Sequence, residues 1–335
     1  MKLLITGGAG FLGARLARQL LARGQLAGQT IDTLVLADQA PAPADLAHDP
    51  RVQVLTGPLL AQCDALAGAG LDGVFHLASA VSGECEADFD LGLRANLDST
   101  RALLEALRAS GRVPRLVFSS SIAVYGSDPA HPMPAVVDDD ALPVPQTSYG
   151  VQKLVCEHLV ADYSRKGFID GRNVRLMTVT VRPGRPNGAA SSFFSGIIRE
   201  PLAGETAICP VDPSVAHPVA SPGRTVAGLI RVYEASVAEC GGRGAINLPG
   251  LNMTVGGMLD ALEAVAGPAA RARVVFQRDA RIAGIVDNWV HQAAFARASR
   301  LGLTPDASFA DIIRDYIADC RAAGLADTAL KGLAG

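Results

Sequence analysis

The chain has 335 residues, of which 49% are hydrophobic and 19% are charged, and its formal net charge is −3. This length and apolar content can bury a large core in one large domain or two unequal ones. The small acidic excess offers no long-range attraction for nucleic acid or an anionic membrane, and no apolar run reaches the roughly 18 residues that a membrane span needs.

An apolar strand is expected at residues 3–6, directly before the glycines Gly7, Gly10 and Gly13 and an amphipathic helix over 12–23. Glycines at this spacing allow a tight turn, close approach of the backbone to a pyrophosphate, and close packing of helix on strand. The pattern therefore predicts a dinucleotide-binding turn. Because the first strand begins at Lys2, no signal peptide fits before it, and we expect a cytoplasmic protein.

Strand-like and helix-like runs alternate through the first half. Such alternation predicts a doubly wound α/β fold, a Rossmann-type parallel sheet buried on both faces. After the first helix we expect strands at 33–37, 52–56, 73–77, 115–119 and 174–181, and helices at 61–69, 87–110 and 148–166. Residues 127–145 hold five of the twenty prolines and are expected to form a loop. Its three consecutive aspartates, Asp138 to Asp140, indicate a solvated acidic loop rather than a metal site.

The pattern is looser after Arg182. Helices are expected at 192–203, 225–238, 254–266 and 309–322, and strands at 206–209, 244–248 and 273–276. We expect residues 1–182 to form a dinucleotide-binding domain, and residues 183–330 to form a smaller α/β substrate lobe whose chain crosses back to the first domain.

Asp38 closes the second predicted strand, 25 residues after Gly13 (38 − 13 = 25), which is slightly beyond the usual spacing of about 20. An insertion at 24–30 accounts for the excess. A carboxylate at this place accepts hydrogen bonds from ribose hydroxyls and repels a 2′-phosphate, which favours NAD over NADP. The competing interpretation is a simple turn residue.

Two further segments carry the chemistry. Ser119, Ser120 and Ser121 end the fifth predicted strand, at the carboxyl edge where such sheets bind ligands. Tyr149 and Lys153 lie one helical turn apart on the helix that follows, so that Lys153 can stabilise the phenolate of Tyr149. A serine hydroxyl and an activated phenol suit proton transfer on an alcohol while a nicotinamide takes or gives hydride. His76, at the end of the fourth strand, is expected to be a buried histidine with satisfied hydrogen bonds rather than a catalyst.

With these motifs the chain resembles the extended short-chain dehydrogenase/reductase family over nearly its whole first half. The resemblance implies that Tyr149 is the general base, that Ser121 orients the reacting oxygen, and that Lys153 also binds the nicotinamide ribose. It further implies that Asn96 supports the active-site geometry and the proton relay. The resemblance also implies a homodimer, paired through the helices at 87–110 and 148–166; alternatively, both helices are ordinary helices that cover the sheet. The residues expected to contact NAD are Gly7, Gly10, Phe11, Leu12, Gly13, Asp38, Leu59, Leu77, Ala78, Ser79, Asn96, Ser119, Tyr149, Lys153 and Pro183.

The second half lacks the two motifs with which sugar-nucleotide epimerases of that family hold the nucleotide. Residues 182–188 and 217–224 stand in their place. Resemblance to family members that oxidise a four-carbon sugar acid implies NAD-dependent oxidation of the 2-hydroxyl of a short sugar acid, D-erythronate being preferred. A guanidinium suits its carboxylate, and Arg185 or Arg224 is expected to supply it. Arg185 alternatively bridges the cofactor or caps a helix, and Arg224 alternatively is a surface residue. The expected polar partners are Ser79, Ser82, Ser120, Ser121, Tyr149, Asn187 and Ser192; Ser120 alternatively faces the helix behind it.

No metal is expected, because the six cysteines and six histidines show no ligand spacing. Two rival functions remain open on the sequence. One is an epimerase or dehydratase that retains its NAD, and the other is a non-catalytic NAD-sensing module.

Overall fold

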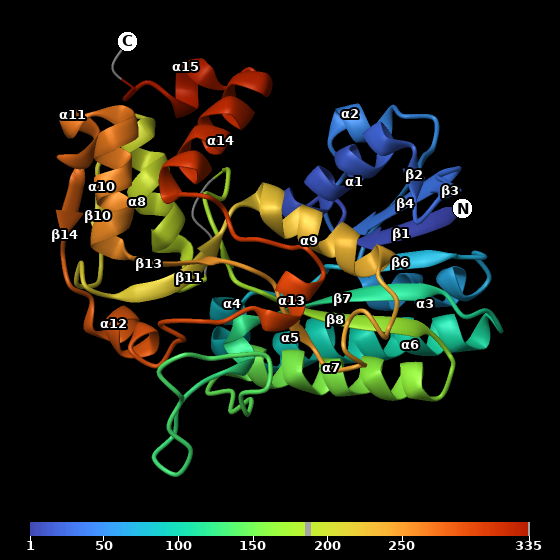
Figure 1. The fold of residues 1–335 in the computed structure, drawn as a ribbon. Helices are drawn as coiled ribbons and strands as arrows, with labels where there is room; N and C mark the ends of the chain where they lie inside the picture. The colour runs from blue at the N-terminus through green and yellow to red at the C-terminus, as the bar shows by residue number, and fades with distance from the viewer. Residues whose placement is uncertain (185–188, 334–335) are drawn as a thin grey trace.

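The computed structural model describes residues 1–184 and 189–333. Its centre is a seven-stranded sheet in the order β12-β8-β7-β6-β1-β4-β5 (Figure 1), in which every neighbouring pair is parallel. The doubly wound α/β fold predicted from the alternation of strands and helices is confirmed. The strands are β1 (Lys2–Thr6), β4 (Thr33–Asp38), β5 (Val52–Thr56), β6 (Gly73–His76), β7 (Arg115–Ser121), β8 (Asp170–Leu176) and β12 (Ile246–Asn247).

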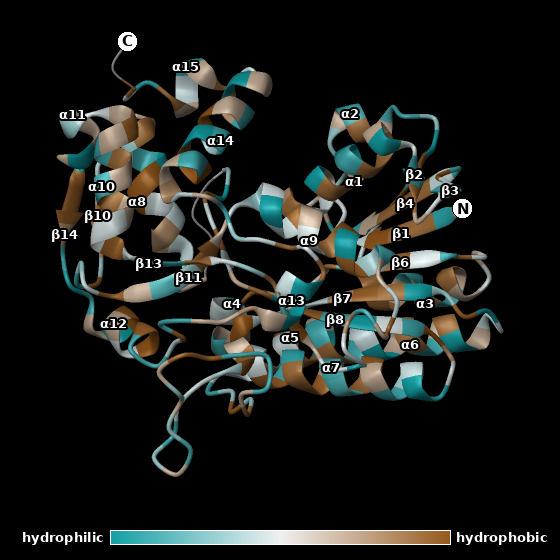
Figure 2. Cartoon of the chain, in the orientation of Figure 1, coloured by the Kyte–Doolittle hydropathy of each residue, from teal (hydrophilic) through white to brown (hydrophobic). Residues whose placement is uncertain are grey.

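Helices cover both faces of this sheet. Because side chains alternate along a strand, Leu3 and Ile5 of β1 pack on one face and Leu4 packs on the other, and all three are fully buried. The first face is covered by α1 (Phe11–Arg23) and α9 (Pro222–Glu234), and the second by α3 (Leu59–Ala67), α6 (Ser99–Ala109) and α7 (Ser148–Arg165). In Figure 2, β1 and β4 are hydrophobic over most of their length, whereas hydrophobic and hydrophilic residues alternate along the helices. The two-faced burial explains the continuous apolar strands of the sequence.

The helix expected at 87–110 is present but is not regular: α5 (Phe89–Gly92), a π-helical turn over Leu93–Asp98 and α6 follow one another without a break. The short helix α4 (Ser82–Ala87) precedes them. Asp88 separates α4 from α5 because its backbone is extended, with φ −137° and ψ 97°, and its carboxylate caps α5 by accepting from the backbone N–H of Leu91. The wider π turn is the place where Asn96 points into the protein.

The strand expected at 174–181 is also divided. β8 ends at Leu176, and β9 (Thr178–Val179) joins a different, three-stranded sheet with β11 (Ala216–Ala220) and β13 (Leu251–Thr254). This small sheet packs with α8 (Ser192–Leu202), α10 (Val255–Ala266) and α14 (Phe309–Ala322) around a second hydrophobic core. Between β11 and β13 the chain returns to the main sheet, where β12 pairs with β8.

The acidic loop is only partly solvated. Asp138 and Asp140 are exposed, but Asp139 is buried and accepts hydrogen bonds from the backbone N–H groups of Asn247 and Arg297. The expectation of a wholly solvated loop is therefore wrong at its central residue. The remaining elements are β2 (Gln25–Leu26), β3 (Gln29–Thr30), α2 (Ala44–Ala47), a 3₁₀ turn (Ile122–Val124), β10 (Ala207–Cys209), α11 (Pro268–Arg271), β14 (Val274–Phe276), α12 (Ala280–Val286), α13 (Ala296–Arg300) and α15 (Ala326–Ala329).

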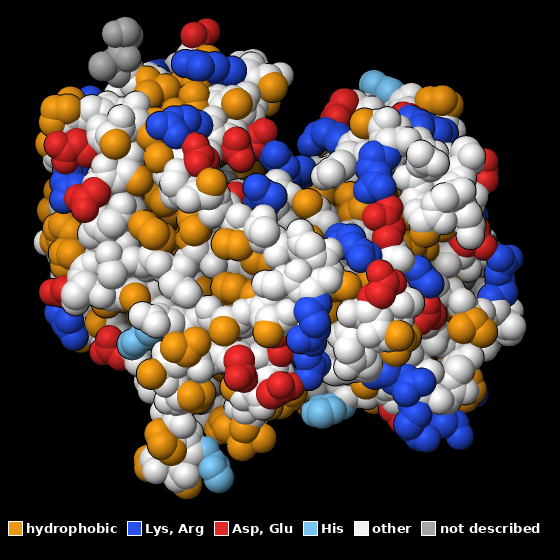
Figure 3. Space-filling model, in the orientation of Figure 1, with side chains coloured by type: hydrophobic (Ala, Val, Ile, Leu, Met, Phe, Trp, Pro, Cys, Tyr) orange, Lys and Arg blue, Asp and Glu red, His pale blue; other side chains and the backbone are white. Residues whose placement is uncertain are grey.

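Among the described residues, no helix combines the length and the apolar character needed to cross a membrane. Acidic and basic side chains are interspersed on the face seen in Figure 3. That face therefore presents no broad surface of one charge to a polyanion.

Candidate active site

A cavity of about 1490 Å³ lies at the carboxyl ends of the central strands, the edge at which open α/β sheets bind ligands. One part of its wall comes from the glycine-rich turn, from Asp38 and from Leu59. A second part comes from the ends of β6, β7 and β8 and the start of α7. A third part comes from α4 and α5, and a fourth from β9 and β11 of the small sheet and from α8 and α12. The cavity thus lies between the two parts of the fold.

The glycine-rich turn has the shape that a dinucleotide requires. Gly7 has a positive φ of +70°, and a Cβ at Gly13 would lie 2.0 Å from the carbonyl oxygen of Gly7. Only glycine lets the N-terminus of α1 pack this closely on the turn, which leaves its backbone N–H groups available to an anion. The local backbone therefore fits a pyrophosphate.

Asp38 takes part in the turn and also faces the cavity. Its Oδ2 accepts from the backbone N–H of Ala9 at 2.9 Å, and its Oδ1 accepts from that of Ala40 at 3.0 Å. Each carboxylate oxygen has a further lone pair, so these bonds leave acceptor capacity for a ribose. The two interpretations of Asp38 are therefore compatible. The extra residues before it form the β2–β3 hairpin.

His76 is a structural residue. It is 1% exposed, and its two ring nitrogens pair with the hydroxyls of Thr6 and Thr100 at 2.6 and 2.8 Å. Burial, and secondarily the charge of Lys153, lowers the pKa of His76 to about 3, so the ring is neutral near pH 7. The prediction of a satisfied buried histidine is confirmed.

Asn96 reaches the cavity only through a neighbour. It is 3% exposed, and its Oδ1 accepts from the Ser79 hydroxyl at 2.9 Å and from the backbone N–H of Ala80 at 2.8 Å. Its Nδ2 donates to Oε1 of Gln152 on α7 at 2.8 Å. Asn96 therefore fixes the loop after β6 to α7, while Ser79 lines the cavity.

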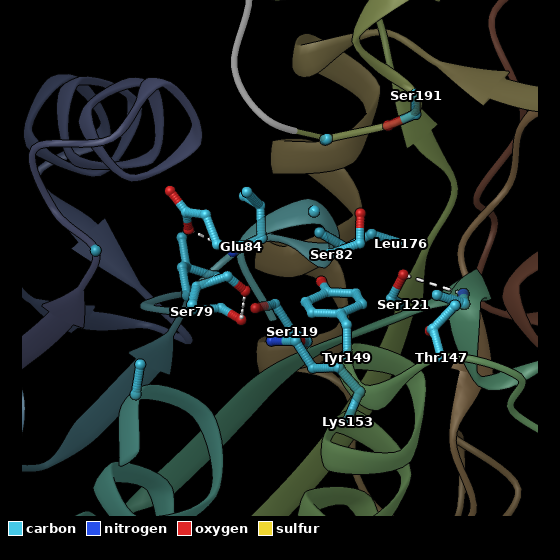
Figure 4. Close-up of a pocket in the computed structure, with 18 of the residues that line it drawn as sticks. Ser79, Ser82, Glu84, Ser119, Ser121, Thr147, Tyr149, Lys153, Leu176 and Ser191 are labelled. Carbon is cyan, nitrogen blue, oxygen red and sulfur yellow. Dashed lines mark hydrogen bonds between the residues drawn. The ribbon is translucent and has the colours of Figure 1, made fainter. Parts of the chain in front are cut away.

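Tyr149, Lys153 and Ser121 come together at one place (Figure 4). Lys153 is 3% exposed, its Nζ donates to the backbone carbonyl of Ser119 at 2.8 Å, and the same nitrogen lies 5.6 Å from the centre of the Tyr149 ring. The ammonium pairs with no carboxylate in the parts of the chain that the structure describes. An ion this buried is costly without compensation, and its charge lies beside the Tyr149 ring at the wall of the cavity.

The serine triplet points in alternate directions. The Ser121 hydroxyl accepts from the backbone N–H of Ala123 at 3.1 Å, which leaves its own proton for a group in the cavity. Ser120 is 2% exposed and donates to Glu157 of α7. Of the two alternatives for Ser120, the structure shows the one in which its side chain faces the helix, because successive residues of β7 face opposite sides of the sheet.

The expected carboxylate partners do not gather here. Arg185 and Asn187 lie outside the described residues. Arg224 is exposed in the first turn of α9 and does not line the cavity; its backbone N–H is capped by the Ser221 hydroxyl. Arg224 as a substrate clamp is therefore a wrong prediction, because α9 packs on the central sheet rather than on the cavity. Pro183 is exposed and is not part of the wall, whereas Ser82 and Ser192 are.

The sequence interpretation missed Arg182, a cation that does line the cavity. Its Nε donates to the carbonyl of Val179 at 2.9 Å, and its Nη2 donates to the Ser191 hydroxyl at 3.1 Å. Burial lowers its pKa, an effect that Tyr149 opposes and Arg199 reinforces. Arg182 forms no ion pair with any carboxylate of residues 1–184 and 189–333. The sequence offered one signal for Arg182: it directly precedes Pro183 and Gly184, which mark the start of a loop.

Aromatic residues of the second half were missed as well. His217, Phe193 and Trp289 line the cavity, and the His217 ring stacks on Phe194 with centroids 5.3 Å apart. Nothing in their spacing along the chain brings them together. Among the residues described, no three histidine, cysteine or acidic side chains lie close enough to hold a metal ion.

Comparison with known proteins agrees with this geometry. The family model described as the NAD dependent epimerase/dehydratase family matches residues 3–215. The chain is 52% identical to a D-erythronate dehydrogenase of Cupriavidus necator, covering 97% of this chain and 100% of the relative, and 41% identical to one of Haemophilus influenzae, covering 95% and 99%.

The crystal structure of a nucleoside-diphosphate-sugar epimerase from Agrobacterium tumefaciens superposes with a TM-score of 0.90 at 41% identity, covering 97% of this chain and 96% of that one. The family model covers more than half of the chain, and it includes the glycine-rich turn, Tyr149 and Lys153. The chain therefore belongs to the NAD dependent epimerase/dehydratase family, the extended branch of the short-chain dehydrogenases/reductases.

Proposed function

We propose that the protein oxidises the 2-hydroxyl of a short sugar acid, D-erythronate in the first instance, to the 2-oxo acid with NAD. The observation that carries the proposal is the contact of Lys153 with Tyr149 beside Ser121 at the wall of a cavity that begins at the glycine-rich turn. A sensing module needs no such proton-transfer group. The two D-erythronate dehydrogenases that match nearly the full chain support the choice of substrate.

In this proposal Tyr149, as the phenolate, accepts the proton of the substrate hydroxyl. The hydroxyl of Ser121 donates a hydrogen bond to the same substrate oxygen, using the proton that its bond with Ala123 leaves free. Lys153 stabilises the phenolate and is available to a nicotinamide ribose. NAD, the cofactor of the family, would supply the hydride acceptor when bound.

Two cations beside Tyr149 support an acidic substrate. Lys153 and Arg182 both line the cavity without a carboxylate partner in the described parts of the chain. We propose that Arg182, rather than the exposed Arg224, binds the substrate carboxylate, since a guanidinium pairs well with a planar anion. Most of the residues after Arg182 accordingly act as the substrate lobe, apart from α9 and β12, which belong to the central sheet layer, and the first 182 residues hold the cofactor.

The deciding experiment is a panel of four- to six-carbon aldonates, uronates, aldoses and UDP-sugars, followed by NADH absorbance. We expect steady NADH production with aldonates, fastest with D-erythronate. The Agrobacterium tumefaciens epimerase structure makes a nucleotide-sugar epimerase the second candidate. Interconversion of UDP-sugars without release of NADH would favour that candidate, and binding of NAD without any turnover would favour a sensor.

Asp38 is expected to select NAD over NADP, because its carboxylate faces the cavity and repels a 2′-phosphate. NAD should bind at least tenfold tighter, a difference of about 1.4 kcal/mol. Asp38→Asn keeps a hydrogen-bond acceptor for Ala9 but removes the charge, so it should narrow the difference more cleanly than Asp38→Ala. Fluorescence titration of both cofactors measures the ratio, and equal affinities in the wild type would contradict this role for Asp38.

We also propose a homodimer. Phe89 of α5 and Val151 and Val155 of α7 are apolar and respectively 59%, 47% and 38% exposed. Contiguous exposed apolar residues on adjacent helices are typical of a protein–protein interface. Light scattering at micromolar concentration should give twice the chain mass, and Val151→Glu with Val155→Glu should give the monomer mass; a monomeric wild type would refute the proposal.

All six cysteines are free and buried. Together with the absence of any Cys-x-x-Cys spacing, this supports the proposal that the protein works in the reducing cytoplasm.

A further inference from the structure

Thr178 and His217 form one wall of the cavity together. Thr178 lies on β9 and His217 on β11, and these parallel strands pair so that Thr178 stands beside Val219. His217 is two residues before Val219 and therefore lies on the same face of the small sheet as Val219. Both residues line the cavity, and they are 7% and 2% exposed.

The hydrogen bonds of His217 determine its tautomer. Its Nδ1 lies 2.8 Å from the carbonyl oxygen of Val290. A carbonyl oxygen only accepts, so Nδ1 must carry a hydrogen. Burial lowers the pKa of His217 to about 4, although its bond to Val290 works in the opposite direction. The ring is therefore neutral near pH 7, and Nε2 carries no hydrogen.

The tautomer of His217 determines the direction of the hydrogen bond that the Thr178 hydroxyl makes. Its Oγ1 lies 2.7 Å from Nε2 of His217, which only accepts. The Thr178 hydroxyl must donate its single proton to His217, so its oxygen can only accept from any group in the cavity. The ring of His217 is held between Phe194 and Trp289, with centroids 5.3 and 5.2 Å away, so the arrangement is rigid.

Thr178 is also close to the proposed reaction centre. Leu176 of β8 pairs with Ser121 of β7, and Thr178 is two residues further along the chain. Two residues of chain span at most roughly 7 Å. Paired strands lie about 4.8 Å apart, so the Cα atoms of Ser121 and Thr178 are within about 12 Å of each other. Both residues line the same cavity, which puts Thr178 within reach of a part of a short substrate other than its reacting oxygen.

We propose that Thr178 is a specificity-determining residue: its oxygen accepts a hydrogen bond from a second substrate hydroxyl, one that is not oxidised, and His217 is the positioning residue that sets this polarity. The inference rests on the proposed function and deepens it. It makes the substrate class a polyhydroxy acid rather than a 2-hydroxy acid with an alkyl chain. A site built to pair with a hydroxyl rejects an analogue that lacks it, because a buried polar group is then left unpaired.

The test compares D-erythronate with its 3-deoxy and 4-deoxy analogues in the wild type and in Thr178→Val. The wild type should prefer D-erythronate over one analogue by on the order of 100-fold in kcat/KM. In Thr178→Val, which keeps the shape of the side chain, we expect that preference to fall at least tenfold. Thr178→Ser should restore it. Thr180→Val is the matched control, because Thr180 is fully buried, does not line the cavity and bonds to Phe194.

A fluorinated analogue tests the direction of the hydrogen bond. Fluorine cannot donate, so the deoxyfluoro acid substituted at the sensitive carbon should be discriminated against by the wild type but not by Thr178→Val. Fluorine affects the chemical step equally in the wild type and in Thr178→Val, so the ratio of their kcat/KM values for the fluorinated acid isolates the hydrogen bond. His217→Phe keeps the stacked ring but frees the Thr178 hydroxyl to turn and donate, so this variant should also lose the discrimination against fluorine.

The outcomes separate the two proposals. A wild type that oxidises D-erythronate while Thr178→Val retains the full preference overturns the role of Thr178 and leaves the proposed function standing. The same holds if the wild type oxidises both deoxy acids with the same kcat/KM as D-erythronate. A wild type that produces no NADH from any sugar acid overturns the proposed function, and the role of Thr178 with it.

Discussion

Replacing Tyr149 by phenylalanine is expected to lower kcat by a factor of on the order of 100 or more while leaving the affinity for NAD nearly unchanged. The ring that packs beside Lys153 remains, and only the ionisable hydroxyl is lost. The proton of the substrate then has no acceptor at this place. Initial rates of NADH formation, with NAD affinity measured separately by titration, check the prediction.

Tyr163→Phe is the matched control for this substitution. Tyr163 lies on the same helix α7, but its hydroxyl bonds to Glu105 and it does not line the cavity. Its loss should leave kcat unchanged. If Tyr149→Phe retained most of its activity, Tyr149 would not be the general base, whatever the substrate.

Replacing Arg182 by methionine is expected to lower kcat/KM for D-erythronate by on the order of 100-fold, the equivalent of about 2.7 kcal/mol for the loss of charge-assisted hydrogen bonds. Most of the effect should fall on KM, because the carboxylate is held in the ground state as well as in the transition state. Methionine fills a similar length of the cavity wall without a charge. Steady-state kinetics at saturating NAD measure both constants.

Two comparisons make the result specific to the carboxylate. Arg224→Met removes a guanidinium from an exposed position outside the cavity and should change neither constant. With erythronamide, the neutral amide of the substrate, the wild type should already be slow and Arg182→Met should cause little further loss. An equal loss on the acid and on the amide would show that Arg182 acts on the protein and not on the carboxylate.

Several features of the fold were readable from neighbouring residues in the sequence. The glycines of the first turn act within seven residues of one another, and Tyr149 and Lys153 share a helix face because they are four apart. The continuous apolar composition of the buried strands by itself predicts a parallel sheet. These features depend on short-range geometry, which is the same in any protein that contains the pattern.

Other features depended on contacts between distant segments. The π-helical turn over Leu93–Asp98 directed Asn96 inward, and the crossing from β8 to β9 took Thr178 out of the main sheet. No periodicity shows where a strand changes sheets, since both sheets bury apolar residues.

The choice among arginines is the clearest case. Arg182 and Arg224 both stand next to a Pro-Gly pair, which marks each as bordering a loop but does not separate the two. Packing does, because α9 lies on the central sheet and carries Arg224 to the surface, while Arg182 stays at the cavity. Likewise, the polarity of Thr178 depends on His217, 39 residues away, whose tautomer depends on Val290, a further 73 residues on. The direction of this hydrogen bond depends on three segments that are far apart in the sequence, so it is determined only once the chain has folded.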